Sequence, residues 1–483
     1  MSPSGAAAPA RQTTEVRPVG GADWRAACLD ELDAGSRFCG AYAAAGEDGG
    51  RRWNVLFANG SATRVVSLRL GAAAPAPSLV DLLPAVDWDE REAHDLHGLD
   101  FDGRSSTRPL VTHTAATESW TVPVRGEGTH EVAVGPVHAG VIESGHFRFH
   151  VVGERILHLD PRLFYKHRGL ERAAEGAELA AGLVFAQRAC GACAVTDAVA
   201  YALAAEATLG MVPDRELRRG RTLLLELERL YNHLNDIAQI CAGVGFAPGN
   251  MAFAALKERA MRLNDDLTGH RFLFGAVAVG AGGPGVSAAR ADALGGALRE
   301  LGEDAAGAWR ELSFAASAQA RFGGVGVLDG ADAVRLGAVG PSARAAGIGL
   351  DCRGSSPGLW YGPGFAAARP PRPSGDVGAR LEVRGVELAV TVELLRELLA
   401  EPIAPGRSQA GQAEPCGVAR VESPRGETVC VVEARAGRVG RLHLRTGSYA
   451  NWPALAHATA GNLLPDFPLI NKSFELCYAC ADR

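Results

Sequence analysis

The chain has 483 residues, of which 47% are hydrophobic and 22% are charged, and its formal net charge is −6. This length is too great for one compact core, so two or three domains are expected. The acidic balance argues against a nucleic-acid partner, which would need a basic face. The sequence has no run of eighteen apolar residues, which a membrane span would need.

Residues 1–20 are rich in Ala, Pro and Thr and lack the apolar segment of a secretory signal. We therefore expect a flexible tail there. Without an export signal, the ten cysteines are expected in a reducing cytoplasm. Cys-x-x-Cys pairs in that setting indicate metal or redox chemistry more than structural disulfides.

Residues 21–103 are expected to form a small α/β domain. The segments RRWNVLFANG and TRVVSLRLG have the composition of strands and are bounded by Gly or Asn. An acidic stretch from Asp87 to Leu96 is expected to be helical. Residues 104–131 show little periodicity and several turn formers, which predicts a linker or an extended arm.

Residues 132–483 are expected to form a mainly helical bundle domain with peripheral hairpins, which makes the whole chain α+β. One hairpin is predicted in GHFRFHVVGERILHLD and another in ETVCVVEARAGRVGRLHLRTG, with its turn at Ala436-Gly437. A long helix is predicted to begin at Asp214, an N-cap residue. Its apolar residues are spaced three and four apart, which is typical of a helix buried in a bundle: Leu223, Leu227, Leu230, Leu234, Ile237 and Cys241. A further helix is expected from Asp376 to Ala400.

Two Cys-x-x-Cys pairs lie almost three hundred residues apart. Cys190 and Cys193 occur in QRACGACAVTD, and Cys477 and Cys480 occur in NKSFELCYACADR. A chain end is usually mobile, so the second pair needs an anchor, and the first pair can provide it. Four thiolates can bind Zn²⁺, an iron–sulfur cluster or nickel, and the spacing alone does not choose among these metals.

The surrounding segments carry a family resemblance. GPVHAGVIESGHFRFHVVGERI, HRGLERAAEG and VESPRGET together resemble the large subunit of energy-converting nickel–iron hydrogenases of the formate hydrogenlyase type. That family is homologous to the 49-kDa-type subunit of respiratory complex I. PAVDWDEREAHDLHGLDFDGR resembles the 30-kDa-type complex I subunit, which is fused ahead of the large subunit in formate hydrogenlyase.

The resemblance implies a nickel–iron centre that cleaves H₂ heterolytically in either direction. Cys190 and Cys477 would be terminal nickel ligands, and Cys193 and Cys480 would bridge to an iron that carries CO and cyanide. A terminal thiolate such as Cys477 would accept the proton of H₂, because metal-bound thiols are deprotonated.

The resemblance also implies roles for three charged residues. Glu171 in RGLE matches a proton-transfer glutamate, and a carboxyl beside a buried cluster would titrate near neutrality. Arg425 in SPRG matches an arginine placed over the iron's cyanide ligands. Glu143 in IESGH matches a glutamate that binds a second metal, Mg²⁺, near the chain terminus. Relatives end there in a histidine ligand, where this chain has Arg483.

Asp197 stands where relatives usually carry a histidine, four residues after Cys193. Three interpretations are open for its carboxyl group. It is protonated and donates a hydrogen bond, it pairs with a cation such as Arg188, or it is ionised in the first turn of a helix and favoured by the helix dipole. We favour the third.

Two other functions compete with a hydrogenase. A complex I-like subunit that serves NADH–quinone oxidoreduction would hold no metal, yet all four cysteines are present, and relatives that reduce quinone carry a tyrosine near Phe185. A zinc-stapled scaffold without catalysis is the second alternative. The expected partners are a small iron–sulfur subunit, membrane subunits and maturation proteins that insert nickel. They would place the chain on the cytoplasmic face of the cell membrane.

Overall fold

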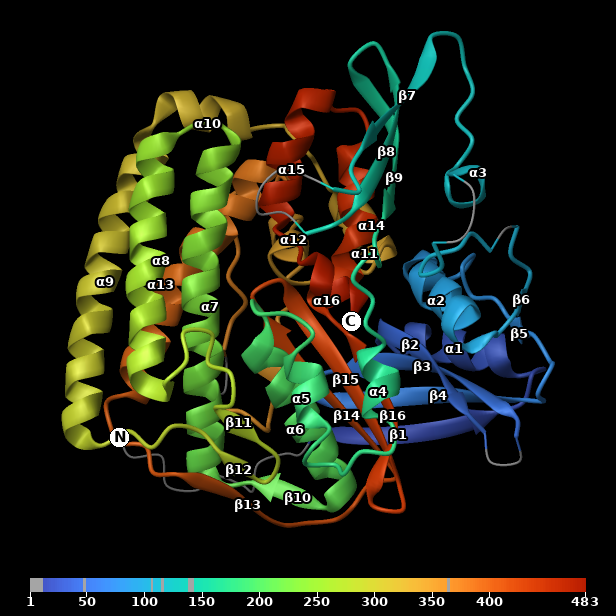
Figure 1. Ribbon diagram of the computed structural model, residues 1–483, viewed down its shortest axis with the longest axis horizontal. Coiled ribbons are helices and arrows are strands. Elements are labelled where there is room, and N and C mark those ends of the chain that lie inside the picture. Colours follow the sequence, from blue (N-terminus) through green and yellow to red (C-terminus); the bar gives the residue numbers. More distant parts are fainter. Residues whose placement is uncertain (1–11, 47–48, 106, 114–116, 138–142, 363–364) are drawn as a thin grey trace.

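The computed structural model describes residues 12–46, 49–105, 107–113, 117–137, 143–362 and 365–483 (Figure 1). A small sheet-based domain lies beside a central three-stranded sheet, and long helices stand on the other side of that sheet. Among the described residues, no helix combines the length and apolar character needed to cross a membrane. The mixed α+β class expected from the sequence is confirmed.

The amino-terminal domain is built on a four-stranded sheet in the order β1-β4-β3-β2. Its strands and its two main helices are β1 (Thr13–Val19), α1 (Trp24–Asp33), β2 (Arg37–Ala45), β3 (Arg51–Asn59), β4 (Ala62–Leu70) and α2 (Asp87–His97). Smaller elements are β5 (Ala76–Pro77), a 3₁₀ turn (Pro84–Val86), β6 (Phe101–Asp102) and α3 (Thr117–Trp120).

The expectation of a flexible tail over residues 1–20 is wrong for residues 13–19. These residues form β1, which pairs in parallel with β4 from Thr13–Ala62 to Val19–Leu68. Backbone hydrogen bonds to the edge of an existing sheet order a segment whose composition alone would not. Residues 1–11 of the expected tail lie outside the described part of the chain.

Both faces of the amino-terminal sheet are buried, because its strands alternate between two cores. Trp53 and Phe57 of β3 point into a core with α1 and α2. Leu56 of β3 and Val65 of β4 point the other way, into a core shared with the central sheet. The amino-terminal domain is therefore docked face to face on the second domain.

The central sheet consists of β14 (Cys416–Ser423), β15 (Gly426–Arg435) and β16 (Arg438–Arg445), all antiparallel. The predicted turn between β15 and β16 is confirmed, with Ala436 at φ 50° and Gly437 at φ 75°. Val429 and Val431 of β15 contact the amino-terminal domain, whereas Cys430 and Val432 pack against the helical core. The sheet thus joins the two halves of the protein.

The helical side of the second domain is dominated by α6 (Ala194–Leu209), α7 (Arg215–Gly243), α8 (Ala247–Thr268), α9 (Ala288–Phe314) and α13 (Val377–Leu398). The predicted cap of α7 is confirmed, because the Asp214 carboxylate accepts a 2.8 Å hydrogen bond from the backbone N–H of Leu217. Asp376 caps α13 in the same way, so this helix begins at Val377.

The remaining elements surround this core. The predicted hairpin forms as β8 (His146–Val152) and β9 (Arg155–Arg162), and β7 (Thr129–Val134) adds to its edge. The shorter helices are α4 (Leu170–Ala174), α5 (Leu183–Gln187), α10 (Ala316–Phe322), α11 (Gly330–Arg335), α12 (Gly340–Ala345), α14 (Gly447–Thr459), α15 (Phe467–Phe474) and α16 (Tyr478–Asp482), with 3₁₀ turns at Cys352–Ser355 and Leu464–Asp466. The strands β10 (Met211–Pro213), β11 (Val277–Ala278), β12 (Ala281–Gly282) and β13 (Gly406–Ala410) form a small outer sheet.

Candidate metal centre

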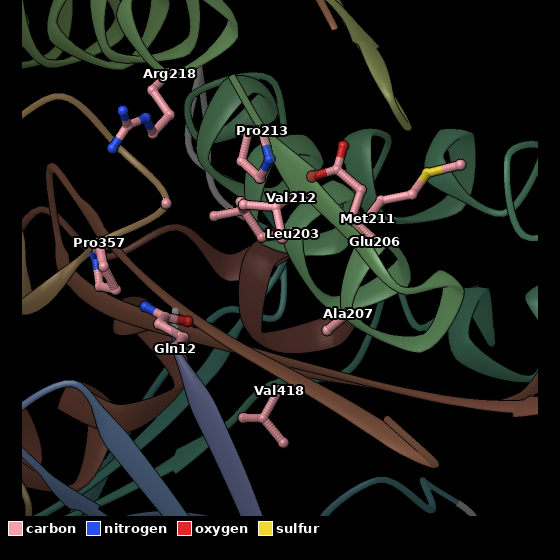
Figure 2. A pocket seen from close by; sticks show the side chains of 11 residues that line it. Gln12, Leu203, Glu206, Ala207, Met211, Val212, Pro213, Arg218, Pro357 and Val418 are labelled. Carbon is pink, nitrogen blue, oxygen red and sulfur yellow. The ribbon is translucent and has the colours of Figure 1, made fainter. Parts of the chain in front are cut away.

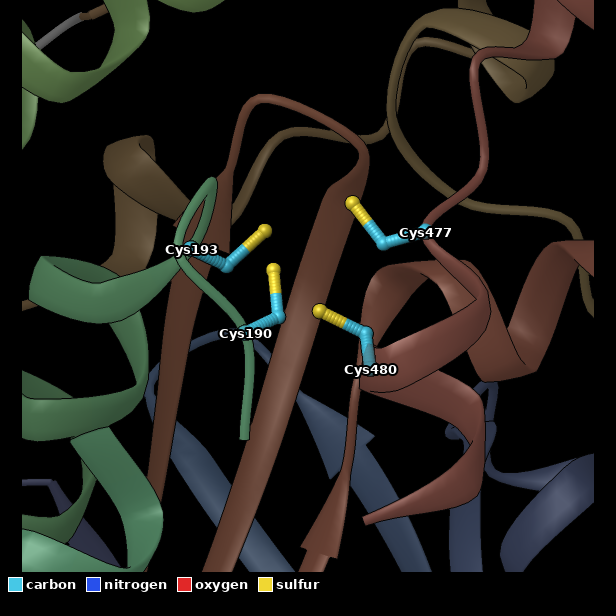
Figure 3. A group of neighbouring side chains, drawn as sticks. All are labelled: Cys190, Cys193, Cys477 and Cys480. Atoms are coloured by element: carbon cyan, nitrogen blue, oxygen red, sulfur yellow. The ribbon is translucent and has the colours of Figure 1, made fainter. Parts of the chain in front are cut away.

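The four cysteines of the two Cys-x-x-Cys pairs meet at one point. Their sulfur atoms all lie within 4.8 Å of one another (Figure 3). Cys190 and Cys193 come from the loop that enters α6, and Cys477 and Cys480 come from the start and middle of α16. Cys480 is fully buried, and only Cys477 is partly exposed.

Side chains of α7 hold the loop that carries the first pair. The Glu228 carboxylate accepts hydrogen bonds of 2.6 and 3.1 Å from the backbone N–H groups of Val195 and Thr196. It thereby caps the N-terminus of α6, a role that α6 does not fill from its own sequence. The Asn232 amide donates a 2.8 Å bond to the carbonyl of Ala192. A rigid helix therefore fixes Cys190 and Cys193 from behind.

The second pair is held by contacts from several parts of the chain. The N–H of Cys477 donates to the Ser448 hydroxyl at 3.0 Å, and the Thr446 hydroxyl donates to the carbonyl of Cys480 at 3.1 Å. Asp482 accepts bonds of 2.7 and 2.9 Å from the N–H groups of Phe164 and Lys166. A five-residue helix such as α16 is too short to be stable alone, so these contacts determine its position.

Arg425 lies in the turn between β14 and β15 and is buried beside the thiols. Its guanidinium donates to Asp236 Oδ1 at 3.0 Å, to the backbone carbonyl of Glu475 at 3.0 Å, and to the side-chain oxygen of Asn232. Arg425 and Cys477 line the same cleft. The arginine therefore supplies a fixed positive charge next to the sulfur atoms.

The thiols form one coupled group. Hydrogen bonds from the other three thiols, with help from the charge of Arg425, lower the pKa of Cys477 well below its usual value. The same sharing, together with burial, raises the pKa of Cys193 and of Cys480. Four buried thiolates would need more positive charge than one arginine provides, and a bound metal supplies it. The donor set fits a thiolate-bound metal.

Glu171 is placed differently from its expected role. Its carboxylate pairs with Arg483 at 2.7 Å and with Arg441 at 3.1 Å, and it accepts a 2.9 Å bond from the N–H of Leu444. Burial alone would raise the pKa of Glu171, but the charges of Arg483, His443 and Arg441 outweigh burial and lower it well below its usual value. The expectation that Glu171 titrates near neutrality is therefore wrong.

Glu143 lies beside the thiols, against the segment that carries Cys477 and Cys480. Its Oε2 accepts a 2.7 Å hydrogen bond from the N–H of Ala479, which stands between Cys477 and Cys480. Glu143 and Cys190 line both clefts that open at the site, one of about 640 Å³ and one of about 520 Å³.

The prediction that Glu143 binds a second metal near the chain terminus stays a prediction, and a different group of possible ligands gathers at Arg483. The carboxylate beside Arg483 is Glu171, in a group with Glu92 and His443 whose ligand atoms lie within 4.8 Å of one another. The Arg483 guanidinium contacts both carboxylates of this group. It supplies the positive charge that Mg²⁺ would bring.

Asp197 occupies the first turn of α6, as expected, but its charge state differs from the favoured interpretation. The side chain is fully buried, and neither carboxyl oxygen has a hydrogen-bond partner. Burial and the neighbouring charges of Glu228 and Cys477 raise the pKa of Asp197 well above its usual value. The helix dipole is too weak to offset this burial, which favours the protonated carboxyl. Arg188 stacks on Phe274 and does not pair with Asp197.

A separate small cavity, of about 40 Å³, lies at the far end of α6 (Figure 2). Leu203, Met211 and Val418 are among its lining residues. Cys193 and Glu206, which also lines the cavity, are separated by about 20 Å along the helix axis at ~1.5 Å per residue. Glu206 is already paired with Arg221. The cavity is distinct from the thiol site.

Four residues that support the site were not predicted from the sequence: Glu228, Asn232 and Asp236 of α7, and Glu92 of α2. In α7 the three polar residues are spaced four apart, on one face of the helix. A polar stripe on a helix that also carries a full apolar stripe is the signal that indicates a buried polar site. No comparable signal marks Glu92, because it lies among other acidic residues.

Comparisons with known proteins agree with this architecture. Residues 244–416 and 406–483 match the family described as respiratory-chain NADH dehydrogenase, 49 Kd subunit, and residues 26–129 match the 30 Kd subunit family. Hydrogenase-4 component G of Escherichia coli (strain K12) is 31% identical over 436 residues, which cover 84% of this chain and 76% of that protein. Formate hydrogenlyase subunit 5 of the same organism is 30% identical over 453 residues, covering 84% and 77%.

A solved structure shares the fold. It is described as the membrane-bound sulfane sulfur reductase, an archaeal respiratory membrane complex, and one of its chains superposes with a TM-score of 0.68 at 26% identity. The match covers 75% of this chain and 100% of that one. The chain therefore belongs to the family of oxidoreductases formed by membrane-bound hydrogenase large subunits and the 49-kDa subunits of complex I, with a 30-kDa-type domain fused ahead of it.

Proposed function

We propose that this chain is the catalytic large subunit of a nickel–iron hydrogenase. The observation that carries the proposal is the meeting of four thiols from two distant Cys-x-x-Cys pairs beside the buried Arg425. A subunit that only shapes a quinone pocket has no need for these thiols. A zinc staple has no need for a buried arginine supported by two α7 side chains.

A nickel–iron group bound at this site would supply the heterolytic cleavage and formation of H₂. The thiolates of Cys190, Cys193, Cys477 and Cys480 would hold this group. Arg425 cannot turn away, because Asp236 and Asn232 bind its guanidinium. Its charge would therefore stay beside the bound group and offset the negative charge of the thiolates.

The proton released at Cys477 needs an acceptor, and we assign this role to Glu143. Glu143 accepts a hydrogen bond from the backbone between Cys477 and Cys480, and it lines both clefts at the site. Glu171 is less suited, because the charges around it hold it ionised over the physiological pH range. Proton transfer needs a group that can both take up and release a proton.

Electrons must leave through a partner. The described part of the chain contains one cluster of cysteines, and it is this site, so a relay of iron–sulfur clusters would come from a small subunit. Relatives and the similar solved structure are named as parts of membrane-bound complexes. We propose the same peripheral place on a membrane for this chain, through partner subunits.

Metal analysis of protein produced together with its maturation proteins tests the proposal. The expected result is nickel and iron in equal amounts, with infrared bands of iron-bound CO and cyanide. Zinc alone would support a stapled scaffold. Absence of metal, with all four thiols titratable, would support a complex I-like subunit, and either result would refute the hydrogenase.

A further inference from the structure

The end of the chain is tied to the amino-terminal domain by a buried ion network. The Arg483 guanidinium contacts Glu92 of α2 through Nη2 and Glu171 of α4 through Nη1, the latter at 2.7 Å. The same Nη1 donates to the carbonyl of Leu444 at 2.8 Å. Arg483 is 3% exposed and Glu92 is 5% exposed, so water does not screen this contact.

The network joins carboxylates and guanidinium groups from both domains. Glu92 and Glu171 contribute two negative charges, and Arg483 and Arg441 contribute two positive charges. Arg441 also donates to the carbonyl of Ala43 at 3.1 Å, which makes a second link to the amino-terminal domain. A planar guanidinium can satisfy two carboxylates and a carbonyl at once, which a lysine ammonium at the end of a flexible stem cannot do in the same geometry.

The position of Arg483 bears directly on the thiols. It follows Cys480 by three residues, within about one helical turn, ~5 Å along the axis. The α16 helix has only five residues, so its place depends on such tertiary contacts. Glu92 holds one end of this short helix, while the other end carries Cys477.

We infer that the fused amino-terminal domain contributes to the thiol site. Glu92 is a positioning residue that holds the carboxyl-terminal tail, residues 476–483, through Arg483. The domain thereby contributes a contact to the segment that carries Cys477 and Cys480. The inference rests on the proposed function at one point: the ordered tail supplies two of the four thiols that would bind the metal. It assigns to the 30-kDa-type domain a role that sheet packing alone would not give it.

The test compares full-length variants without metal, under reducing conditions. Glu92→Gln keeps the shape of the side chain and removes its charge, and Arg483→Lys keeps the charge and removes the fork. Hydrogen–deuterium exchange of residues 476–483 and the alkylation rate of Cys480 report on the order of the tail. We expect both rates to rise at least tenfold in each variant, with exchange in α7 unchanged.

A matched control is available at the same domain interface. Arg37 of β2 pairs with Glu427 of β15 at 2.5 Å, and Glu427 keeps a second partner, Arg420, at 3.2 Å. Arg37→Gln therefore removes an ion pair across the interface and leaves the partner's second pair within the second domain, as Glu92→Gln does. Among the described residues, Arg37 has no ion pair with residues 476–483. We expect its tail exchange and alkylation rates to stay within twofold of the wild type.

Three results would overturn the inference: tail rates within twofold of the wild type in Glu92→Gln, equal increases in Arg37→Gln, or a freely exchanging tail in the wild-type protein. If Glu92→Gln fails to fold, Arg483→Lys decides, because it leaves the amino-terminal domain unchanged. Nickel content is measured separately. A wild-type protein without nickel whose tail still loosens in Glu92→Gln would refute the proposed function and leave this inference standing.

Discussion

Both sides of the thiol site bury carboxyl groups, but the pKa values of these groups shift in opposite directions. On the tail flank, defined by Glu171, Arg441 and Arg483, two guanidinium groups keep the carboxylate ionised. On the α6 flank, defined by Asp197 and Glu228, no arginine or lysine contacts Asp197 among the described residues, and burial raises the pKa of Asp197 far and that of Glu228 to about 7. Burial sets the size of the effect, and the neighbouring charges set its direction.

The two flanks therefore have different roles at the site. An ionised carboxylate between two arginines is a structural anchor, because removing either charge leaves the other unpaired in the interior. A protonated Asp197 adds no negative charge next to the thiolates, which favours a cluster of four sulfur ligands on the α6 flank.

Deleting residues 477–483 removes two thiols and the cation of the tail flank together. We expect nickel retention to fall below a tenth of the wild-type amount, because two ligands remain of four. The amino-terminal domain keeps its own core of Trp24, Trp53 and Phe57, so its exchange protection should persist. Metal analysis and hydrogen exchange measure both, and full nickel occupancy in the truncated chain would contradict the assignment of the tail.

Glu143→Gln keeps the shape of the side chain and its contact with the N–H of Ala479, but it cannot carry a proton. We expect H₂/D₂O isotope exchange to fall by at least about a hundredfold, the usual scale for losing a proton-transfer group. Nickel content should stay normal. Exchange at the wild-type rate would show that the proton leaves by another path.

Glu171→Gln should act on stability more than on turnover. It leaves Arg483 and Arg441 without their shared carboxylate, so we expect a loss of about 3 kcal/mol in the free energy of unfolding. Isotope exchange per bound nickel should change less than tenfold, because a carboxylate that stays ionised does not carry protons. Chemical denaturation and exchange assays separate the two, and a hundredfold loss of exchange at full nickel content would return Glu171 to the proton path.

The two flanks also predict opposite dependences of stability on pH. The pKa of Glu171 is lowered on folding, so its contribution is complete above the unfolded value of about 4.3 and is lost as pH falls toward the folded pKa. The pKa of Asp197 is raised, so the folded state binds the extra proton above pH ~4 and stability falls as pH rises, by up to about 1.4 kcal/mol per unit.

Asp197→Asn removes the second slope and leaves the first. We expect the variant to be close to the wild type at pH 5 and more stable than it at pH 8, with activity changed less than tenfold, because a neutral amide replaces a neutral carboxyl. The infrared bands of iron-bound CO and cyanide should not move. Equal destabilisation at both pH values would show that Asp197 is ionised in the folded protein.

Local signals in the sequence were sufficient for several elements. The Asp214 cap and the apolar spacing identified α7, and the Ala436-Gly437 turn identified the β15–β16 hairpin, because a cap or a turn depends on a few consecutive residues. α9 was not identified. Its first residue follows a Ser287 cap, but its Ala- and Gly-rich sequence gives a weak apolar stripe in which Leu294, Leu298 and Leu301 are the main contacts.

Motifs in the sequence were enough to predict the candidate residues of the site: the two Cys-x-x-Cys pairs, Arg425 and two glutamates. The roles that we propose for the two glutamates depend on the fold. Glu171 and Glu143 lie 28 residues apart in the chain. Glu171 is surrounded by α2, β16 and the last residues of the chain, whereas Glu143 lies at the clefts beside the thiols. Coulomb interactions in a buried site depend on distance in space, so charge state, partner and role follow from the fold and cannot be found in the motif.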